Sequence, residues 1–392
     1  MTRMESGDSG ARRERSVLVH EFVTGGGLAG AELPPSLRAE GDAMRRALAA
    51  DFARVPGVRV VMTLDARSPH EPGPWDLVRV GPGQEPGAFA RLSGDADYTL
   101  VIAPETGGIL FDRARILDRL GARSLGCTPA SIADAGNKLV AFDRFLAAGV
   151  RTPPTRAVSP RDAWPRRVDF PTGGPAAPPS AAGPLDGPAT TRAAEAEVGH
   201  PAVLKPVDGA GSTHTFLLEG EADWPDPGWS PEVALLQPRV DGDLRSASVL
   251  VDREGRPHVL GFASQRTAVD RGRISYEGGI APLRFGEGEL RMVSRVVRAL
   301  PGLRGWVGID FVDDGTGMPV VLEVNPRPTT SVVAFLDLLG PGTLATAWLA
   351  LFEDAPKDLL AGLFRRIRSR LDSPIAFDPD GSIHPLPEGA RP

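Results

Sequence analysis

The chain has 392 residues, which is long enough for two or three domains. Its 41% hydrophobic and 24% charged residues are ordinary for a globular protein, and a formal net charge of −6 offers no basic surface for nucleic acid. No run approaches the roughly 20 apolar residues of a membrane helix, and the single cysteine, Cys127, excludes an internal disulfide. We expect residues 1–15 to be a disordered tail and not a secretory signal, and the protein to be cytoplasmic.

The first part of the chain alternates strand-like and helix-like segments. Apolar and β-branched runs predict strands at Ser16–His20, Val58–Thr63 and Asp97–Ala103, and helical spacing predicts helices at Ala39–Phe52 and Ile109–Leu120. This alternation indicates an open α/β sheet over residues 16–126. Ligands of such sheets bind at the carboxyl ends of the strands, where Glu21 and Glu105 lie.

A different pattern, dominated by strands, begins near residue 127. We expect a helix over Asp134–Ala148, and a flexible insertion over residues 159–199, which are rich in Pro, Gly, Ala and Arg. Further strands are predicted at Pro201–Pro206, Ala234–Gln237, Ala247–Val251, His258–Phe262, Trp306–Val312 and Val320–Asn325. Further helices are predicted at Leu290–Leu300, Thr343–Glu353 and Lys357–Leu371, followed by an extended tail from Ser373.

Two of these strands carry a set of oxygen ligands. Because side chains alternate along a strand, Glu323 and Asn325 share one face, opposite Leu322 and Val324. A turn between the two strands brings Asp310 close to Glu323, and such a set of carboxylate and amide oxygens suits Mg²⁺. Just past the second strand, Arg327 is placed to reach a phosphate. The alternative is a polar, solvent-exposed face of a hairpin.

Two lysines are candidates for binding phosphate. Lys205 ends an apolar strand at residues 205–212 (KPVDGAGS), where a Gly/Ser loop offers free backbone N–H groups to an anion. The loop is not a P-loop, since no GK[ST] follows. Lys138 lies in the first turns of a predicted helix. A plain turn and a solvated surface lysine are the alternatives for the two sites.

A third segment, residues 235–242 (LLQPRVDG), changes from apolar to polar at a point where backbone groups can pair with an adenine edge. An edge strand followed by a turn explains this segment equally well.

Taken in chain order, these motifs resemble the ATP-grasp superfamily over roughly residues 126–335. The resemblance implies α/β and α+β structure: an N-terminal open α/β pre-ATP-grasp domain (16–126), then two lobes that clasp the nucleotide. The small lobe would span 127–233, including the insertion 159–199. The C-terminal lobe, with the metal site, would span 234–392.

The resemblance also implies roles for these residues. ATP would be the cofactor, with one or two Mg²⁺ ions, for which Mn²⁺ is the expected substitute, held by Asp310, Glu323 and Asn325. Both lysines would contact the phosphates, under a mobile loop that includes Gly209, Gly211 and Ser212. The backbone of Gln237, Arg239 and Val240 would bind adenine, and Asp241 or Asp243 would lie near the ribose.

A narrower resemblance concerns the N-terminal residues 20–27 (HEFVTGGG). They are similar to the opening of the tyramine–glutamate ligase group, and Gln265-Arg266 and residues 276–279 (YEGG) also fit that group. The long insertion departs from its compact members. The resemblance implies an ADP-forming carboxylate–amine ligase that works through an acyl phosphate, joining glutamate to tyramine or tyrosine in methanofuran-type cofactor biosynthesis.

Assignments for the substrates follow from this hypothesis. Arg266 is the candidate for binding the carboxylate of the acid, because a planar guanidinium binds a carboxylate through two hydrogen bonds. Glu21 or Glu105 is the candidate for holding the amine, and Tyr276 for a further substrate contact. We expect small-molecule amino acid and amine substrates, neither nucleic acid nor membrane as a partner, and a homodimer as the assembly to test. An amino-acid or dipeptide ligase and a non-catalytic nucleotide-binding protein are the alternatives, and a dinucleotide-binding enzyme is a rival class suggested by the α/β N-terminal domain.

Overall fold

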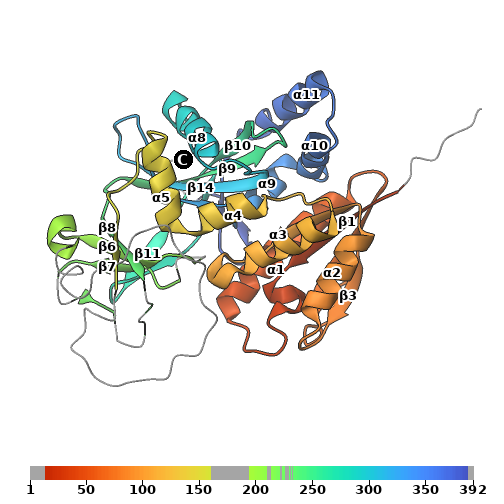
Figure 1. Cartoon of the computed structure of the whole chain (residues 1–392). Helices are drawn as coiled ribbons and strands as arrows, with labels where there is room; N and C mark the ends of the chain where they lie inside the picture. The colour runs from red at the N-terminus through yellow and green to blue at the C-terminus, as the bar shows by residue number, and fades with distance from the viewer. Residues whose placement is uncertain are drawn as a thin grey trace, which may run out of the picture.

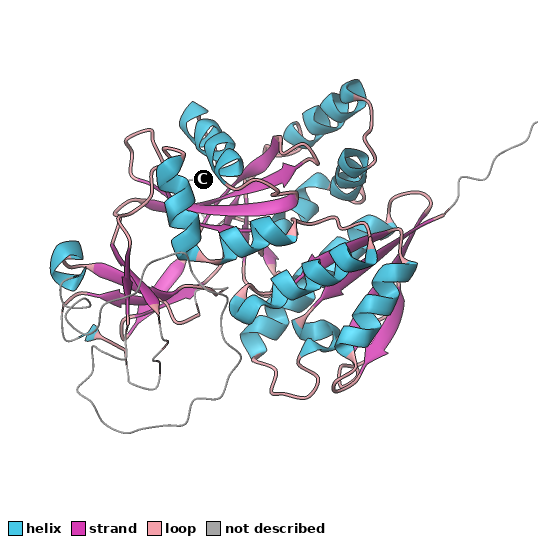
Figure 2. Ribbon diagram, in the orientation of Figure 1, coloured by secondary structure: helices cyan, strands magenta, loops and turns pink. Residues whose placement is uncertain are grey.

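The computed structural model describes residues 14–159, 194–209, 213–220, 223–225, 229, 231 and 233–386. These residues form an N-terminal α/β domain and two lobes, each built on an antiparallel sheet (Figure 1). Figure 2 shows strands at the centre of each part, with helices packed around the sheets of the N-terminal domain and of the larger lobe. Most of the predicted insertion and residues 1–13 of the predicted tail lie outside the described residues.

The N-terminal domain is an open parallel sheet, as the alternating pattern predicts. Its strands run in the order β3-β2-β1-β4, and its elements are β1 (Arg15–Glu21), α1 (Pro35–Ala53), β2 (Val58–Asp65), β3 (Asp76–Val80), α2 (Glu85–Asp95), β4 (Tyr98–Ile102) and α3 (Ile109–Leu120). Val17 and Val19 of β1 belong to the same buried cluster as residues of α1, whereas Leu18 belongs with α2 and α3. Helices therefore cover both faces, which buries most of β1 and all of β4.

The smaller lobe is a six-stranded antiparallel sheet in the order β11-β12-β7-β6-β8-β5. Its strands are β5 (Arg156–Val158), β6 (Ala202–Pro206), β7 (Phe216–Leu218), β8 (Ala234–Pro238), β11 (Thr267–Asp270) and β12 (Arg273–Tyr276). The last two form a hairpin that leaves the larger lobe after residue 264 and joins β7 through the pairing of Arg273 with Phe216. The sheet is therefore assembled from two separate stretches of the chain.

The larger lobe has a four-stranded antiparallel sheet in the order β10-β9-β14-β15, and a three-stranded sheet, β13-β16-β17. Its strands are β9 (Asp243–Val251), β10 (Pro257–Ser264), β13 (Gly279–Ala281), β14 (Gly305–Asp313), β15 (Val320–Asn325), β16 (Ile375–Phe377) and β17 (Ile383–His384). Its helices are α8 (Glu287–Ala299), α9 (Ser331–Leu339), α10 (Thr343–Phe352) and α11 (Lys357–Arg368). The apolar face of β14, with Ile309 and Phe311, shares a buried cluster with α8. Asp310 therefore faces the opposite side of the sheet.

The helix predicted over Asp134–Ala148 is in fact two helices, α4 (Pro129–Gly136) and α5 (Lys138–Ala147). Asn137 breaks it, because its backbone is extended and its Oδ1 accepts hydrogen bonds from the N–H groups of Leu139 (3.1 Å) and Val140 (3.2 Å). Lys138 therefore begins a helix, and its own N–H donates to the carbonyl of Val207 just after β6 (3.0 Å). The break fixes Lys138 beside the loop that follows Lys205.

The N-terminal domain is packed firmly against the larger lobe. The ring of Phe52 on α1 lies 6.1 Å from that of Trp348 on α10, which in turn lies 6.4 Å from Trp306 on β14. Asp51 on α1 accepts a hydrogen bond from the N–H of Ala345 (2.7 Å) at the start of α10. In the described part of the chain no single helix is long and apolar enough to cross a membrane; α9 and α10 together satisfy length and composition, but they are bent by 105°.

Candidate active site

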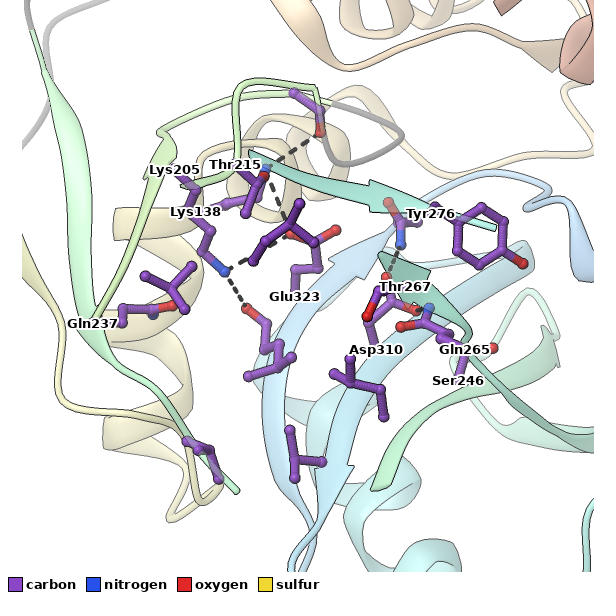
Figure 3. Close-up of a pocket in the computed structure, with 18 of the residues that line it drawn as sticks. Lys138, Lys205, Thr215, Gln237, Ser246, Gln265, Thr267, Tyr276, Asp310 and Glu323 are labelled. Carbon is purple, nitrogen blue, oxygen red and sulfur yellow. Dashed lines mark hydrogen bonds and ion pairs between the residues drawn. The ribbon is translucent and has the colours of Figure 1, made fainter. Parts of the chain in front are cut away.

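A cavity of about 370 Å³ lies between the two lobes, and many of the predicted site residues line it (Figure 3). Its lining comes from β6, β7, β8, β11 and β12 of the smaller lobe and from β9, β14 and β15 of the larger one. α1, α5 and the segment after β15 also contribute to the lining, with Glu40, Lys138, Arg327, Thr329, Thr330 and Ser331. A concave site in which polar and charged side chains converge is typical of a ligand site.

The two acidic residues at the centre of the cavity are direct partners in the sheet. Asp310 on β14 pairs with Glu323 on β15, as the sequence predicts. Asn325 donates from Nδ2 to Asp310 Oδ2 (3.0 Å), and Gln265 donates from Nε2 to Asp310 Oδ1 (2.8 Å). Removal from water and the charge of Glu323 raise the pKa of Asp310. Two carboxylates held this close require a cationic neighbour.

The alternation predicted for β15 is interrupted next to this pair. Asp310 pairs with Glu323 but Phe311 pairs with Val321, so Leu322 is an extra, bulged residue. The prediction that Leu322 faces away with Val324 is therefore wrong: Leu322 lines the cavity, whereas Val324 lies in the core. The bulge also brings the carbonyl of Leu322 to within 3.4 Å of Lys205 Nζ, which donates to it.

The two predicted lysines supply the positive charge. Lys138 Nζ lies 3.6 Å and Lys205 Nζ 3.9 Å from Glu323 Oε2, and Figure 3 shows both lysines on the side of Glu323 away from Tyr276. Burial lowers the pKa of Lys205 to about 8, against the opposing effect of Glu323. Although removal from water raises the pKa of Glu323, the lysines and Arg327 lower it overall, so this carboxylate is ionised. Acidic and basic groups thus meet in one place.

At the lysine end the cavity has the features expected of a nucleotide site. Gln237, Arg239 and Val240 line it beside the apolar side chains of Val203 and Leu322. The side chain of Gln237 is buried and donates to Thr155 Oγ1 (2.8 Å), which holds β8 next to the chain leading into β5. The carbonyl of Gly209 accepts a hydrogen bond from Lys138 Nζ (3.3 Å). Asp243 is largely exposed and is not among the lining residues, and Gly211 and Ser212 lie outside the described residues.

Beyond Asp310, the opposite end of the cavity is polar; the sequence analysis named Tyr276 as a substrate contact but neither Glu40 nor Thr330. Tyr276 lies there, as Figure 3 shows, and Gln265 lies between it and Asp310. Removal from water raises the pKa of the Tyr276 phenol, with a further contribution from the charge of Glu40. The signal in the sequence was the Gln265-Arg266 pair, of which only Gln265 reaches the cavity.

The structure places Arg266 outside this cavity. Its guanidinium forms an ion pair with Asp378 (2.6 Å) and donates to the carbonyl of Glu277 (2.8 Å). These bonds tie the start of the β11–β12 hairpin to the segment after β16. Arg266 misses the cavity because neighbouring side chains of an extended chain point in opposite directions, and Gln265 points into it. The hypothesis that Arg266 binds the carboxylate of a substrate therefore has no support from this geometry.

Glu21 also lies away from the cavity. It is buried, and its carboxylate accepts hydrogen bonds from the N–H of Val23 (3.0 Å) and from both the N–H and the Oγ1 of Thr24 (2.6 Å each). It thereby holds the turn at Val23–Gly27. In that turn a Cβ on Gly25 would lie only 2.4 Å from Thr63 Oγ1, which shows how closely the glycines pack against the strand ends.

Glu105 is bound to the predicted phosphate ligand Arg327. Both side chains are buried, and Arg327 Nε lies 3.0 Å from Glu105 Oε1. The carboxylate is therefore occupied and does not line the cavity, whereas Arg327 does. Of Glu21, Glu105 and Glu40, only Glu40 lines the cavity, and the sequence analysis did not name it.

The residues around Asp310 fit a magnesium ion. Asp310, Glu323 and Asn325 offer carboxylate and amide oxygens from two paired strands at the cavity wall. Within the part of the chain that the structure describes, no group of three or more His, Cys, Asp or Glu residues has the geometry of a self-sufficient metal site. A pair of carboxylates suits an ion that takes its other ligands from phosphates and water, which is the behaviour of Mg²⁺.

Comparison with protein families agrees with this architecture. A family model described as an ATP-grasp domain matches residues 180–331, and a pre ATP-grasp 3 domain matches residues 58–132. The chain thus has the ATP-grasp fold with a pre-ATP-grasp domain in front of it, and the fold predicted from the four motifs is confirmed.

Among curated relatives, the chain is similar to the tyramine–L-glutamate ligase of Methanocaldococcus jannaschii. The identity is 24% over 242 residues, 61% of this chain and 58% of the relative. The enzyme of the same name from Methanocaldococcus fervens is 24% identical over 237 residues, 60% of each chain. The matched region thus spans somewhat less than two thirds of these relatives, and the narrower resemblance seen in the sequence is confirmed at this level.

Solved structures share the fold at lower identity. An ATP-grasp superfamily protein from Archaeoglobus fulgidus has a TM-score of 0.59 and 21% identity, covering 89% of this chain and 88% of its own. An ADP complex of N5-carboxyaminoimidazole ribonucleotide synthetase has a TM-score of 0.58 at 15% identity, covering 88% and 78%. An L-amino acid ligase from Bacillus licheniformis has a TM-score of 0.52 at 15% identity, covering 83% and 71%.

Proposed function

We propose that this protein is an ATP-dependent ligase that joins a carboxylate to an amine through an acyl phosphate. The observation that carries the proposal is the meeting of Lys138 and Lys205 with the Asp310–Glu323 pair in one cavity. Lysines suit the phosphate oxygens of ATP, and paired carboxylates suit the magnesium ion that accompanies them. The ATP-grasp fold and the similarity to tyramine–L-glutamate ligases support this assignment.

In the first step, a carboxylate oxygen of the acid attacks the γ-phosphorus of ATP, and ADP leaves. Lys138 and Lys205 neutralise the repulsion between the two anions, which is the main protein contribution to phosphoryl transfer. Arg327 is a further cation at the cavity wall. Asp310, Glu323 and Asn325 would hold Mg²⁺, or Mn²⁺ in its place, which when bound adds charge neutralisation.

In the second step, the amine nitrogen attacks the acyl carbon, phosphate leaves, and the nitrogen gives up a proton. The acyl phosphate hydrolyses readily, so the protein must keep water away from it. The β11–β12 hairpin contributes Thr267, Val269, Ile274 and Tyr276 to one wall of the cavity. The hairpin thereby helps to enclose the space in which the intermediate would form.

For the substrates, we propose glutamate as the acid and tyramine or tyrosine as the amine, in the biosynthesis of a methanofuran-type cofactor. The similarity to enzymes named for tyramine and L-glutamate supports this choice. An amino-acid or dipeptide ligase of another pathway is the second candidate, since the fold is shared with an L-amino acid ligase. A cytoplasmic location and a homodimeric state remain predictions from the sequence.

The test is an ADP-release assay with Mg-ATP, in which L-glutamate and other amino acids are each combined with tyramine, tyrosine and other amines. We expect ADP release that requires both an acid and an amine, with an amide product of matching mass. ATP binding without ADP release for any pair would contradict the proposal and favour a nucleotide-binding protein. Release with pairs of amino acids but not with tyramine would favour the second candidate.

A further inference from the structure

Glu40 of α1 is a carboxylate from the N-terminal domain that lines the cavity between the lobes. Its charge acts on Tyr276, which lies at the end away from the two lysines, and also on Arg327. Thr330, just before α9, donates from its hydroxyl to Glu40 Oε1 across 290 positions of sequence. The docking of α1 against α9 thus brings an acid of one domain into a site built by the others.

The charge of Glu40 is not balanced by any described residue of the chain. Among the described residues Glu40 forms no ion pair, and its hydrogen-bond donor, Thr330, is neutral. Burial lowers the pKa of Arg327, whereas the charges of Glu105 and then Glu40 raise it, so Glu40 lies near Arg327. The guanidinium of Arg327 is, however, bound to Glu105. Two carboxylates and one guanidinium leave one negative charge at this end of the cavity. A half-buried carboxylate in this situation favours a cationic ligand.

We propose that Glu40 binds the ammonium group of the amino-acid or amine substrate; this inference rests on the proposed ligase function and specifies one contact in it. An ammonium nitrogen donates charge-assisted hydrogen bonds to a carboxylate, which are stronger than neutral ones. Tyr276 stands in the same part of the cavity as a neutral phenol, because its pKa is raised, and its ring offers an apolar face to the carbon skeleton. The site therefore selects organic substrates that carry a positive nitrogen.

Glu40 takes the place that the sequence analysis gave to Glu21 or Glu105. Neither of those carboxylates is available, since Glu21 holds the turn after β1 and Glu105 holds Arg327. The two lysines and the predicted adenine contacts lie at the other end, and Arg327 keeps its bond to Glu105, so loss of the charge on Glu40 should leave ATP binding intact. That separation makes the inference testable without turnover.

The experiment measures binding to the full chain by calorimetry, with Mg²⁺ and a non-hydrolysable ATP analogue present. The probes are two matched pairs, L-glutamate with glutarate and tyramine with 4-ethylphenol, in which the second member lacks the nitrogen. We expect wild-type protein to bind at least one nitrogen-bearing member about tenfold or more tightly than its partner. Glu40→Gln, which keeps an oxygen for Thr330, should remove that preference and leave the affinity for the ATP analogue unchanged.

The control is Glu32→Gln, which removes the same charge from an exposed position just before α1, outside the cavity lining. It should keep the preference. The role of Glu40 is overturned if wild type shows no preference in either pair or if Glu40→Gln retains the preference. It is also overturned if Glu40→Gln lowers the affinity for the ATP analogue as much as the affinity for the nitrogen-bearing probe. ADP release by wild type, measured in parallel, tests the ligase proposal separately. If wild type turns over and Glu40→Gln keeps the binding preference, only the role of Glu40 is refuted.

Discussion

Arg327 and Glu105 form a buried ion pair that joins the segment after β15 to the loop after β4. The guanidinium also donates to the carbonyl of Pro328 (3.1 Å), so its position is fixed from two sides. The pair links the larger lobe to the N-terminal domain, and it holds Arg327 at the cavity wall.

Replacing Glu105 with Ala should destabilise the protein by about 3 kcal/mol, because Arg327 would stay buried without a counter-ion. The midpoint of urea unfolding, followed by circular dichroism, measures the change. The matched control is Glu254→Ala, which removes an exposed ion pair with Arg256 and should cost about 0.5 kcal/mol or less. Equal midpoints for the two variants would contradict the role given to the buried pair.

Glu323→Ala should lower ATP-dependent turnover by about 100-fold or more, because a magnesium ligand and the partner of both lysines are lost together. Thermal unfolding should change little, since the side chain lies at the cavity wall and not in the core. ADP release at several Mg²⁺ concentrations is the measurement. Glu287→Gln on the surface of α8 serves as the control, and ADP release by Glu323→Ala at the wild-type rate would refute the metal assignment.

The pKa of Lys205 predicts an alkaline limit for ATP use. The pKa is lowered to about 8, so the lysine is mostly protonated at pH 7 and loses its charge as the pH rises through 8. We expect kcat/KM for ATP to fall above pH 8, by up to about tenfold per pH unit. Lys205→Arg keeps the charge and should move this limb to higher pH. A wild-type profile that stays flat to about pH 10 would contradict the assignment.

Gly25→Ala should destabilise the N-terminal domain by about 1–3 kcal/mol, because the new methyl group would overlap Thr63 Oγ1, 2.4 Å away. Differential scanning calorimetry tests this. Gly87→Ala in α2 is the control: nothing lies within 4 Å of its Cβ position, and alanine favours a helix, so this variant should be slightly more stable than wild type. Equal transition temperatures for the two variants would show that the turn tolerates a side chain.

Much of the fold could be predicted because it depends on local patterns. α3 and β15 begin and end where the apolar spacing places them, at Ile109–Leu120 and Val320–Asn325. β3, α2 and α9 were missed. β3 shows why: only Val80 is buried in it, so it lacks the apolar run that marks the central strands. Asn137 shows a different limit, since a single side chain acting as a cap divides what reads as one helix.

The candidate site divides in the same way. Asp310 and Glu323 could be placed together because one hairpin connects them. Glu40 could not, because its place depends on how α1 docks on α9, and no local pattern reports a contact over 290 positions. The bulge at Leu322 was missed for a related reason: it is defined by the pairing between strands and leaves no mark in the composition of either one.

The smaller lobe cannot be completed until part of the larger lobe has been synthesised. Its sheet needs β5 to β8, and then β11 and β12, which follow only after β9 and β10 of the other lobe. A nascent chain ending at Pro238 would leave β7 with an open edge, a surface prone to wrong pairing. The wall formed by the hairpin is therefore added late, after two strands of the larger lobe have been synthesised.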